Sequence, residues 1–166
     1  MINGKTVLAV IPARSGSKRC PNKNFLPFRG KPLYDWALEA AQKSSYIDAH
    51  ILSLDKDRPA ELCTDEATNE DVLRHHLAAM PHDWVVLLQP TSPLRTAADI
   101  DACIELAVSN GSAALTVNEI GGHKNGAVYV ASAEWIERHD FSHAGYAKLV
   151  MPDERSLDID YEEQFQ

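Results

Sequence analysis

Apolar runs alternate along this chain with segments that have the periodicity of amphipathic helices. Residues 84–88 are continuously apolar, which indicates a strand covered on both faces. Residues 32–43 place apolar side chains at helical spacing after a proline in the first turn. The other expected strands are 6–11, 49–54, 113–117, 127–131 and 146–151, and the other expected helices are 68–80, 96–110 and 133–139. This alternation predicts an α/β fold with an open, mostly parallel, Rossmann-like sheet and helices on both faces.

Size and composition narrow the class of protein. A chain of 166 residues fits a single domain spanning residues 1–166. No apolar run approaches the roughly 18 residues that span a bilayer, and the N-terminus does not have the pattern of a signal peptide. The three cysteines are far apart, so we expect reduced thiols and a cytoplasmic location, without a membrane partner.

Charge is distributed unevenly. The first 34 residues contain seven Lys or Arg and no acid, whereas the rest of the chain carries nine cations against 24 acids. A net charge of −8 argues against nucleic acid as a partner. Four cations lie in the Gly/Ser/Pro loop that follows the first apolar run: Arg14, Lys18, Arg19 and Lys23. This arrangement favours a small anionic ligand such as a polyphosphate, the alternative being a solvated basic loop without a ligand.

The basic loop matches neither common glycine-rich phosphate motif. Gly16-Ser17-Lys18 lacks the earlier glycine of G-x-x-x-x-G-K-[ST], and G-x-G-x-x-G is absent. Ligands of open α/β sheets bind beyond the carboxyl ends of the strands. We therefore expect the loops after Ile11, Leu54 and Leu88 to lie at one edge of the sheet.

Two further segments carry polar side chains suited to chemistry. Residues 89–95, Gln-Pro-Thr-Ser-Pro-Leu-Arg, follow an expected strand and offer hydrogen bonds at its end, although this segment taken alone favours a simple strand-to-helix turn capped by Thr96. Asp158 and Asp160 are two residues apart, so an extended chain puts both carboxylates on one face, opposite Leu157 and Ile159. Paired carboxylates suit Mg²⁺, and the alternative is a solvated acidic segment. The histidines have no spacing typical of a metal site.

Taken together, these motifs resemble the acylneuraminate cytidylyltransferases, the CMP-sialic acid synthetase family. The matching segments are residues 11–24, Gly30-Lys-Pro-Leu33, Arg58-Pro-Ala-Glu-Leu62 with Asp65, residues 89–95, Asn125-Gly-Ala-Val-Tyr129 and residues 155–160, in family order. The resemblance implies a nucleotide-diphospho-sugar transferase-like fold. It also implies a Mg²⁺-dependent transfer of CMP from CTP to the anomeric hydroxyl of a sialic-acid-like 2-keto-3-deoxy sugar acid, with release of pyrophosphate.

The resemblance also assigns roles to residues that match the family's motifs. Catalytic roles fall on Arg14, Lys23, Asp158 and Asp160, with Asp158 and Asp160 as the metal ligands. Gln89 matches a sugar-contacting glutamine. The nucleotide-binding set is Arg14, Ser15, Gly16, Lys18, Asn24, Arg58 and Thr68.

The chain departs from the family pattern in two places. One helix and one strand that usually precede the Arg58 element are missing. Only five residues separate Glu119 from Asn125, where the family has a long excursion that forms its dimer and contacts the sugar. We therefore do not expect the family's homodimer. Two other functions stay open: a nucleotide-binding subunit with impaired catalysis, and a nucleotidyltransferase with another acceptor.

Overall fold

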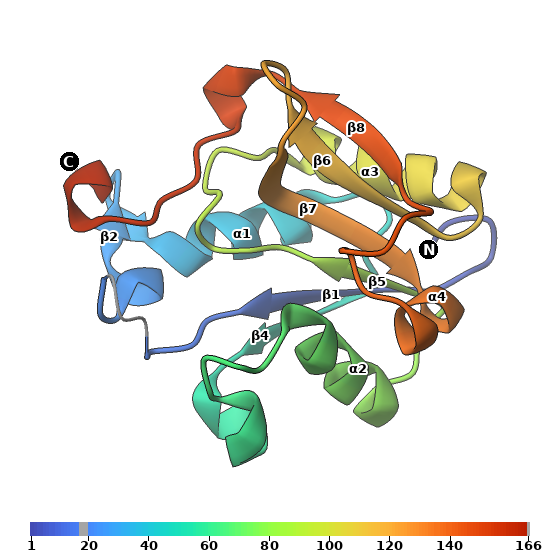
Figure 1. Cartoon of the computed structure of the whole chain (residues 1–166), viewed down its shortest axis with the longest axis horizontal. Coiled ribbons are helices and arrows are strands. Elements are labelled where there is room, and N and C mark those ends of the chain that lie inside the picture. The colour runs from blue at the N-terminus through green and yellow to red at the C-terminus, as the bar shows by residue number, and fades with distance from the viewer. Residues whose placement is uncertain (17–19, 166) are drawn as a thin grey trace.

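A six-stranded mixed sheet forms the centre of the protein (Figure 1). The structure, a computed structural model, describes residues 1–16 and 20–165. The sheet order is β4-β1-β5-β7-β6-β8. Its strands are β1 (Val7–Pro12), β4 (Ala49–Ser53), β5 (Trp84–Leu87), β6 (Ala113–Asn118), β7 (Lys124–Ser132) and β8 (Ala147–Met151). All six expected strands form, and the expected α/β fold is confirmed.

One strand runs against the others. β1 is parallel to β4 and β5, and β6 is parallel to β8, whereas β7 is antiparallel to both of its neighbours, β5 and β6. Leu87 at the end of β5 pairs with Tyr129, so residues 124–128 of β7 extend past the carboxyl end of β5. The reversal thus brings the start of β7 to the edge where β1, β4 and β5 end.

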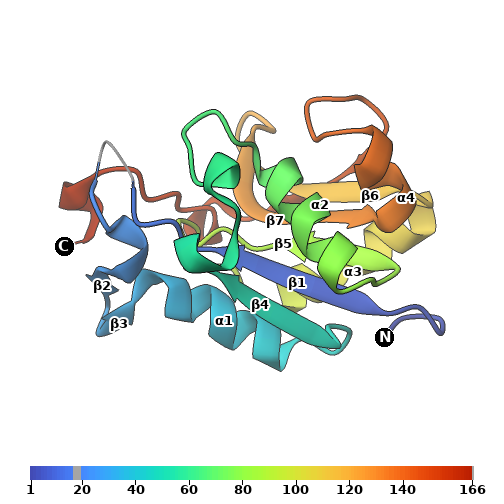
Figure 2. The ribbon, with the colours of Figure 1, turned by 90° about the horizontal axis from the view of Figure 1, so that it is seen from below.

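Helices cover both faces of the sheet, as predicted. They are α1 (Leu33–Lys43), α2 (Asn69–Ala79), α3 (Ala97–Asn110) and α4 (Ala133–Arg138). Buried side chains of α1 and α3 pack with Val7, Ala9 and Ile11 of β1. Those of α2 and α4 pack with Leu8 and Val10, which point to the opposite face. Figure 2 shows α1 and α2 on opposite sides of β1 and β4.

Helices α2 and α3 begin with the same local motif. In α2 the Thr68 hydroxyl accepts from the Asp71 N–H and the Asp71 carboxylate accepts from the Thr68 N–H, which is a capping box. Thr96 and Asp99 repeat it in α3, which ends at Gly111 with φ +77°. These signals explain why the helix boundaries agree with the expected ones. No helix within residues 1–16 and 20–165 is long and apolar enough to cross a membrane.

Short elements complete the structure. β2 (Pro27–Phe28) and β3 (Lys31–Pro32) form a small hairpin between the basic loop and α1. Five 3₁₀ helices lie in the described ranges: η1 (Lys23–Phe25), η2 (Asp55–Asp57), η3 (Ala60–Leu62), η4 (Asp153–Arg155) and η5 (Glu162–Phe165). Between β4 and Arg58 the chain forms only the single turn η2, so the additional helix and strand of the family pattern are absent from this described segment. Residues 119–123 form a short connection between β6 and β7.

Candidate functional site

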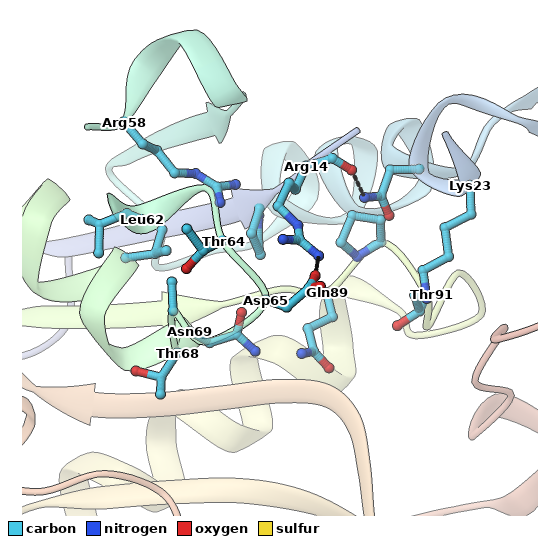
Figure 3. A pocket seen from close by; sticks show the side chains of 15 residues that line it. Arg14, Lys23, Arg58, Leu62, Thr64, Asp65, Thr68, Asn69, Gln89 and Thr91 are labelled. Carbon is cyan, nitrogen blue, oxygen red and sulfur yellow. Dashed lines mark hydrogen bonds and ion pairs between the residues drawn. The ribbon is translucent and has the colours of Figure 1, made fainter. Parts of the chain in front are cut away.

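A polar cavity of about 230 Å³ opens at the carboxyl ends of β1, β4 and β5 (Figure 3). The loops that follow these three strands all contribute to it, as the sequence predicted. Lys23 and Thr91 line one end, and Thr68 and Asn69 at the start of α2 line the other. The remaining lining residues are Pro12, Arg14, Asn24, Arg58, Leu62, Thr64, Asp65, Ala67, Val72, Gln89 and Pro90.

Arg14 lies between Arg58 and Lys23 in the cavity wall (Figure 3). Its guanidinium donates to the Cys63 carbonyl at 3.2 Å and to the Asp65 carboxylate at 2.7 Å. The Asn24 side-chain amide donates to the Arg14 carbonyl at 2.9 Å and ties the two ends of the basic loop together. Arg14 and Asn24 thus come together in the cavity as predicted, but a carboxylate already pairs with the arginine.

The other predicted residues of the basic loop lie further out. Ser15 is exposed, and its N–H and hydroxyl both donate to the Asp55 carboxylate. Gly16 is exposed too, with open space where a side chain would start. The predicted contact of Lys18 lies outside the described residues. The sequence analysis named Asp65 only as part of a matching segment, and it predicted neither the pairing of Asp65 with Arg14 nor that of Asp55 with Ser15.

Arg58 reaches the cavity from the segment after β4. Its Nε donates to the Ser53 hydroxyl at 2.8 Å and its Nη2 donates to the Ser53 carbonyl at 2.7 Å. Burial lowers the pKa of Arg58 from its usual value, but an arginine remains charged at neutral pH. The cavity therefore receives two fixed cations, Arg14 and Arg58, from different strands.

Thr68 at the start of α2 and Gln89 after β5 both line the cavity. Thr68 lines the cavity while its hydroxyl caps α2. Gln89 follows β5, and its side-chain oxygen lies against the backbone of Gly126, where an added Cβ would be only 2.6 Å from that oxygen. Gly126 has φ +76°, a conformation that glycine adopts readily. Its close approach to Gln89 was not predicted.

The carboxyl-terminal segment brings two carboxylates to the Lys23 end. The Ile159 N–H donates to the Thr91 carbonyl at 2.8 Å, and the Ile159 side chain is fully buried against Phe28 and Leu33. Asp160 lies 3.6 Å from the Lys23 ammonium. Ile159 and Leu157 pack inward, as the alternation of side chains predicted.

The surroundings of Asp158 raise the pKa of its carboxyl group. Loss of solvent around the carboxyl raises the pKa of Asp158, although the residue as a whole is exposed, and the nearby charge of Asp160 adds to this effect. The Thr91 hydroxyl and the Lys23 ammonium act in the opposite direction. Two carboxylates and one lysine thus form a single electrostatic cluster at the cavity rim.

Further contacts outside the cavity hold this segment. The Arg155 guanidinium donates to both oxygens of Asp99, at 3.0 and 2.8 Å, and Asp99 is the capping residue of α3. The buried Asn125 side chain donates to the Ser156 hydroxyl at 3.1 Å. Sequence reasoning missed these anchors, since no local signal joins residues so far apart in the chain.

The donor set at Asp158 and Asp160 fits a magnesium ion. Both side chains offer the oxygen atoms that hard cations prefer, and their mutual repulsion would be relieved by a cation. Among the described residues no group of three or more His, Cys, Asp or Glu is arranged for a metal. Mg²⁺ commonly takes one or two carboxylates and leaves its other positions to water and substrate phosphates, so two carboxylates are enough.

Comparison with known proteins agrees with this geometry. Residues 8–67 match the sequence model of the cytidylyltransferase family. Over 116 residues, 60% of this chain, the sequence is 35% identical to an N-acylneuraminate cytidylyltransferase of Escherichia coli O18:K1:H7. The chain is thus similar in sequence to N-acylneuraminate cytidylyltransferases. It is also 33% identical, over 69% of its length, to a CMP-N,N'-diacetyllegionaminic acid synthase of Legionella pneumophila.

The relationship covers only part of these relatives. The chain spans 28% of the length of the Escherichia coli protein and 58% of the Legionella protein. Over nearly the whole chain, the fold is that of a CMP:2-keto-3-deoxy-manno-octonic acid synthetase solved with CTP. The TM-score is 0.75 at 15% identity, with 96% of this chain and 95% of that one covered. The expected nucleotide-diphospho-sugar transferase-like fold is therefore confirmed.

Proposed function

We propose that this relative of the N-acylneuraminate cytidylyltransferases is itself a cytidylyltransferase that transfers CMP from CTP to an acidic sugar. One observation carries the proposal: Arg14, Arg58 and Lys23 line one cavity whose rim holds Asp158 and Asp160. Three cations next to two carboxylates suit a nucleoside triphosphate with a divalent cation. The relatives' names support cytidine as the nucleoside and an acidic sugar as the acceptor.

The cationic wall would bind the triphosphate. Arg14 and Arg58 are fixed by hydrogen bonds to neighbouring residues, so little rearrangement of their side chains would be needed when phosphate oxygens replace the carboxylate of Asp65. Ser15, Gly16 and Lys18 would complete the contacts from the basic loop, and Thr68 and Asn24 those from the cavity wall. Positioning and charge neutralisation are the main contributions that proteins make to phosphoryl transfer.

The carboxylates would hold Mg²⁺ at the Lys23 end. A bound Mg²⁺ would neutralise charge on the phosphates as pyrophosphate leaves. Asp158 and Asp160 would supply the oxygen ligands, and the hydrogen bond from the Ile159 N–H to the Thr91 carbonyl holds the segment between them. Lys23 is 3.6 Å from Asp160, where its ammonium can also meet the triphosphate.

Gln89 would contact the acceptor, for which we propose a sialic-acid-like 2-keto-3-deoxy sugar acid. The Gln89 amide lies on the wall formed by β5 and β7. The anomeric hydroxyl would attack the α-phosphorus in line. The bond from that oxygen to phosphorus forms as the bond to the bridging oxygen breaks, pyrophosphate departs, and the hydroxyl proton is released to solvent.

Nucleotide binding tests the first half of the proposal. Calorimetry with Mg²⁺ and CTP, UTP, ATP or GTP in turn should show tightest binding of CTP. Equal affinity for all four nucleotides would contradict a cytidylyltransferase. CTP binding without turnover of any acceptor would instead favour a nucleotide-binding subunit.

Turnover tests the second half. Pyrophosphate release with CTP and a panel of 2-keto-3-deoxy sugar acids should identify the acceptor. Asp158→Asn and Asp160→Asn should each lower that release by about 100-fold or more, since one displaced ligand removes a metal contact made in the transition state. Glu163→Gln removes one exposed charge from the same segment and is the matched control. Turnover like that of the unmodified protein in both Asn variants would refute the assignment.

A further inference from the structure

A row of polar side chains leads from the cavity into the core, and the proposed function leaves its innermost member without a role. Arg58 Nε donates to the Ser53 hydroxyl at 2.8 Å, and that hydroxyl is 2.7 Å from Nε2 of His76. Ser53 is fully buried at the end of β4, and His76 is 5% exposed in the last turn of α2. The three residues come from a strand, the segment after it and a helix.

The chemistry of the donors fixes the first hydrogen bond of this row, and the protonation of His76 sets the second. A guanidinium has no acceptor, so the Ser53 oxygen must accept from Arg58. The single hydroxyl proton is then free to be donated to His76 Nε2, which requires a neutral imidazole with its proton on Nδ1. Burial lowers the pKa of His76, the charges of His75 and Arg58 lower it further, and Asp57 opposes them, so the neutral form is favoured at pH 7.

The same contacts determine how Arg58 faces the cavity. Nε and Nη2 both bond to Ser53, one to its hydroxyl and one to its carbonyl, so the guanidinium plane is held by a single residue. The carbonyl belongs to the backbone at the end of β4 and does not depend on a side chain. The hydroxyl can rotate, and an acceptor for its proton keeps a lone pair directed at Arg58. The neutral His76 imidazole supplies that acceptor at 2.7 Å.

We propose that His76 is a positioning residue for Arg58, acting through the Ser53 hydroxyl to hold the guanidinium where a phosphate of the nucleotide would bind. The inference rests on the proposed function, because it takes Arg58 as a nucleotide contact. It assigns His76 no contact with the substrate. Its consequence is that removing the imidazole should weaken nucleotide binding from a distance.

Binding of CTP with Mg²⁺, measured by calorimetry on the full chain, tests this. Arg58→Ala should weaken binding by tenfold or more, as expected for a hydrogen bond to a charged group, roughly 1.5–3 kcal/mol. His76→Leu leaves the Ser53 proton without its acceptor and should weaken binding by about three- to tenfold. His76→Gln can present an amide oxygen near the position of Nε2 and should bind within about twofold of the unmodified protein. His75→Gln, the neighbour on α2, is the matched control.

A double variant separates positioning from a general loss of structure. In the Arg58→Ala background, His76→Leu should cause no further loss of CTP affinity, because the group it positions is gone. If the losses multiply instead, His76 acts on the fold and not on Arg58, and the inference is overturned. Ser53→Ala removes the intermediate hydroxyl and should reproduce the effect of His76→Leu. It serves as the test if thermal unfolding shows that His76→Leu does not fold.

The outcomes distinguish this inference from the proposed function. If the unmodified protein does not bind CTP, or if Arg58→Ala binds it equally well, the nucleotide role of Arg58 is wrong and the inference is overturned with it. If Arg58→Ala loses affinity while His76→Leu and Ser53→Ala do not, the proposed function survives and the role of His76 is refuted. Weak binding by His76→Leu with rescue by His76→Gln supports it.

Discussion

At the scale of single residues, Gly126 lets the Gln89 amide lie against the backbone of β7. An added Cβ would meet the Gln89 oxygen at 2.6 Å, and the backbone has φ +76°. Gly126→Ala should therefore destabilise the fold by about 1–2 kcal/mol from the backbone conformation alone. It should also displace Gln89 and raise the KM for the acceptor more than the KM for CTP. Urea unfolding and steady-state kinetics measure the two effects.

Gly111→Ala is the matched control for that substitution. Gly111 has nearly the same φ, +77°, but nothing lies within 4 Å of the position its Cβ would take. The two variants should thus lose similar stability from the backbone, and only Gly126→Ala should alter the acceptor KM. Identical kinetics in both variants would contradict a role for the Gly126 contact in positioning Gln89.

The buried His76 should also make stability depend on pH. Its pKa is lowered in the folded protein, mainly by burial, so the unfolded chain binds more protons as pH falls through the ordinary histidine value of about 6.5. The free energy of unfolding should consequently be highest above pH 7 and decrease on acidification toward pH 5.5. Urea titrations of the unmodified protein and His76→Gln should show a smaller decrease in the variant. His50→Gln, which replaces an exposed histidine of β4, is the matched control.

At the scale of elements, α3 and α2 start with the same capping box, but the aspartates of the two boxes differ in their additional contacts. Asp99 also accepts both hydrogen bonds from Arg155 and is 7% exposed, whereas Asp71 pairs only with Arg74 of its own helix. Asp71→Ala should cost about 1 kcal/mol, the value of a cap. Asp99→Ala should cost about 2–4 kcal/mol, because it also leaves Arg155 unpaired. Equal losses on urea unfolding would mean that the Arg155 contact contributes nothing.

Local signals in the sequence were sufficient for the elements themselves. Thr68, Thr96 and Gly111 mark helix ends through contacts within a few residues, so the helices were predicted nearly to their boundaries. The loops at the carboxyl ends of β1, β4 and β5 were predicted to meet because parallel strands share an edge.

Contacts between distant residues could not be predicted in this way. The pairing of Arg14 with Asp65 depends on the path of the segment after β4, and the reversed direction of β7 depends on the order of strands in the sheet. The contact of Gln89 with Gly126 follows from that reversal. The roles of Arg14, Lys23, Asp158 and Asp160 remain predictions, although the structure brings these residues to one cavity and its rim.

At the scale of the whole molecule, we propose that the protein does not form the homodimer that the family resemblance implied. Residues 119–123 make only a short turn between β6 and β7, and Ile120 at this turn is 78% exposed. Light scattering over a range of concentrations should give the mass of one chain. A dimer that Ile120→Asp dissociates would show that the turn itself mediates assembly, and would contradict the proposal.

The direction of β6 determines at which edge of the sheet that turn lies. β6 runs the same way as β1 and β5, because both β5 and β6 are antiparallel to β7, so the turn opens at the edge of the sheet that holds the cavity. A longer loop spliced between β6 and β7 would extend from this edge without interrupting any strand. A loop lengthened at this turn would therefore extend beside the cavity and leave the segments that carry Arg14 and Arg58 unchanged. For protein engineering, this turn is the position at which to graft a new loop next to the cavity of a compact scaffold.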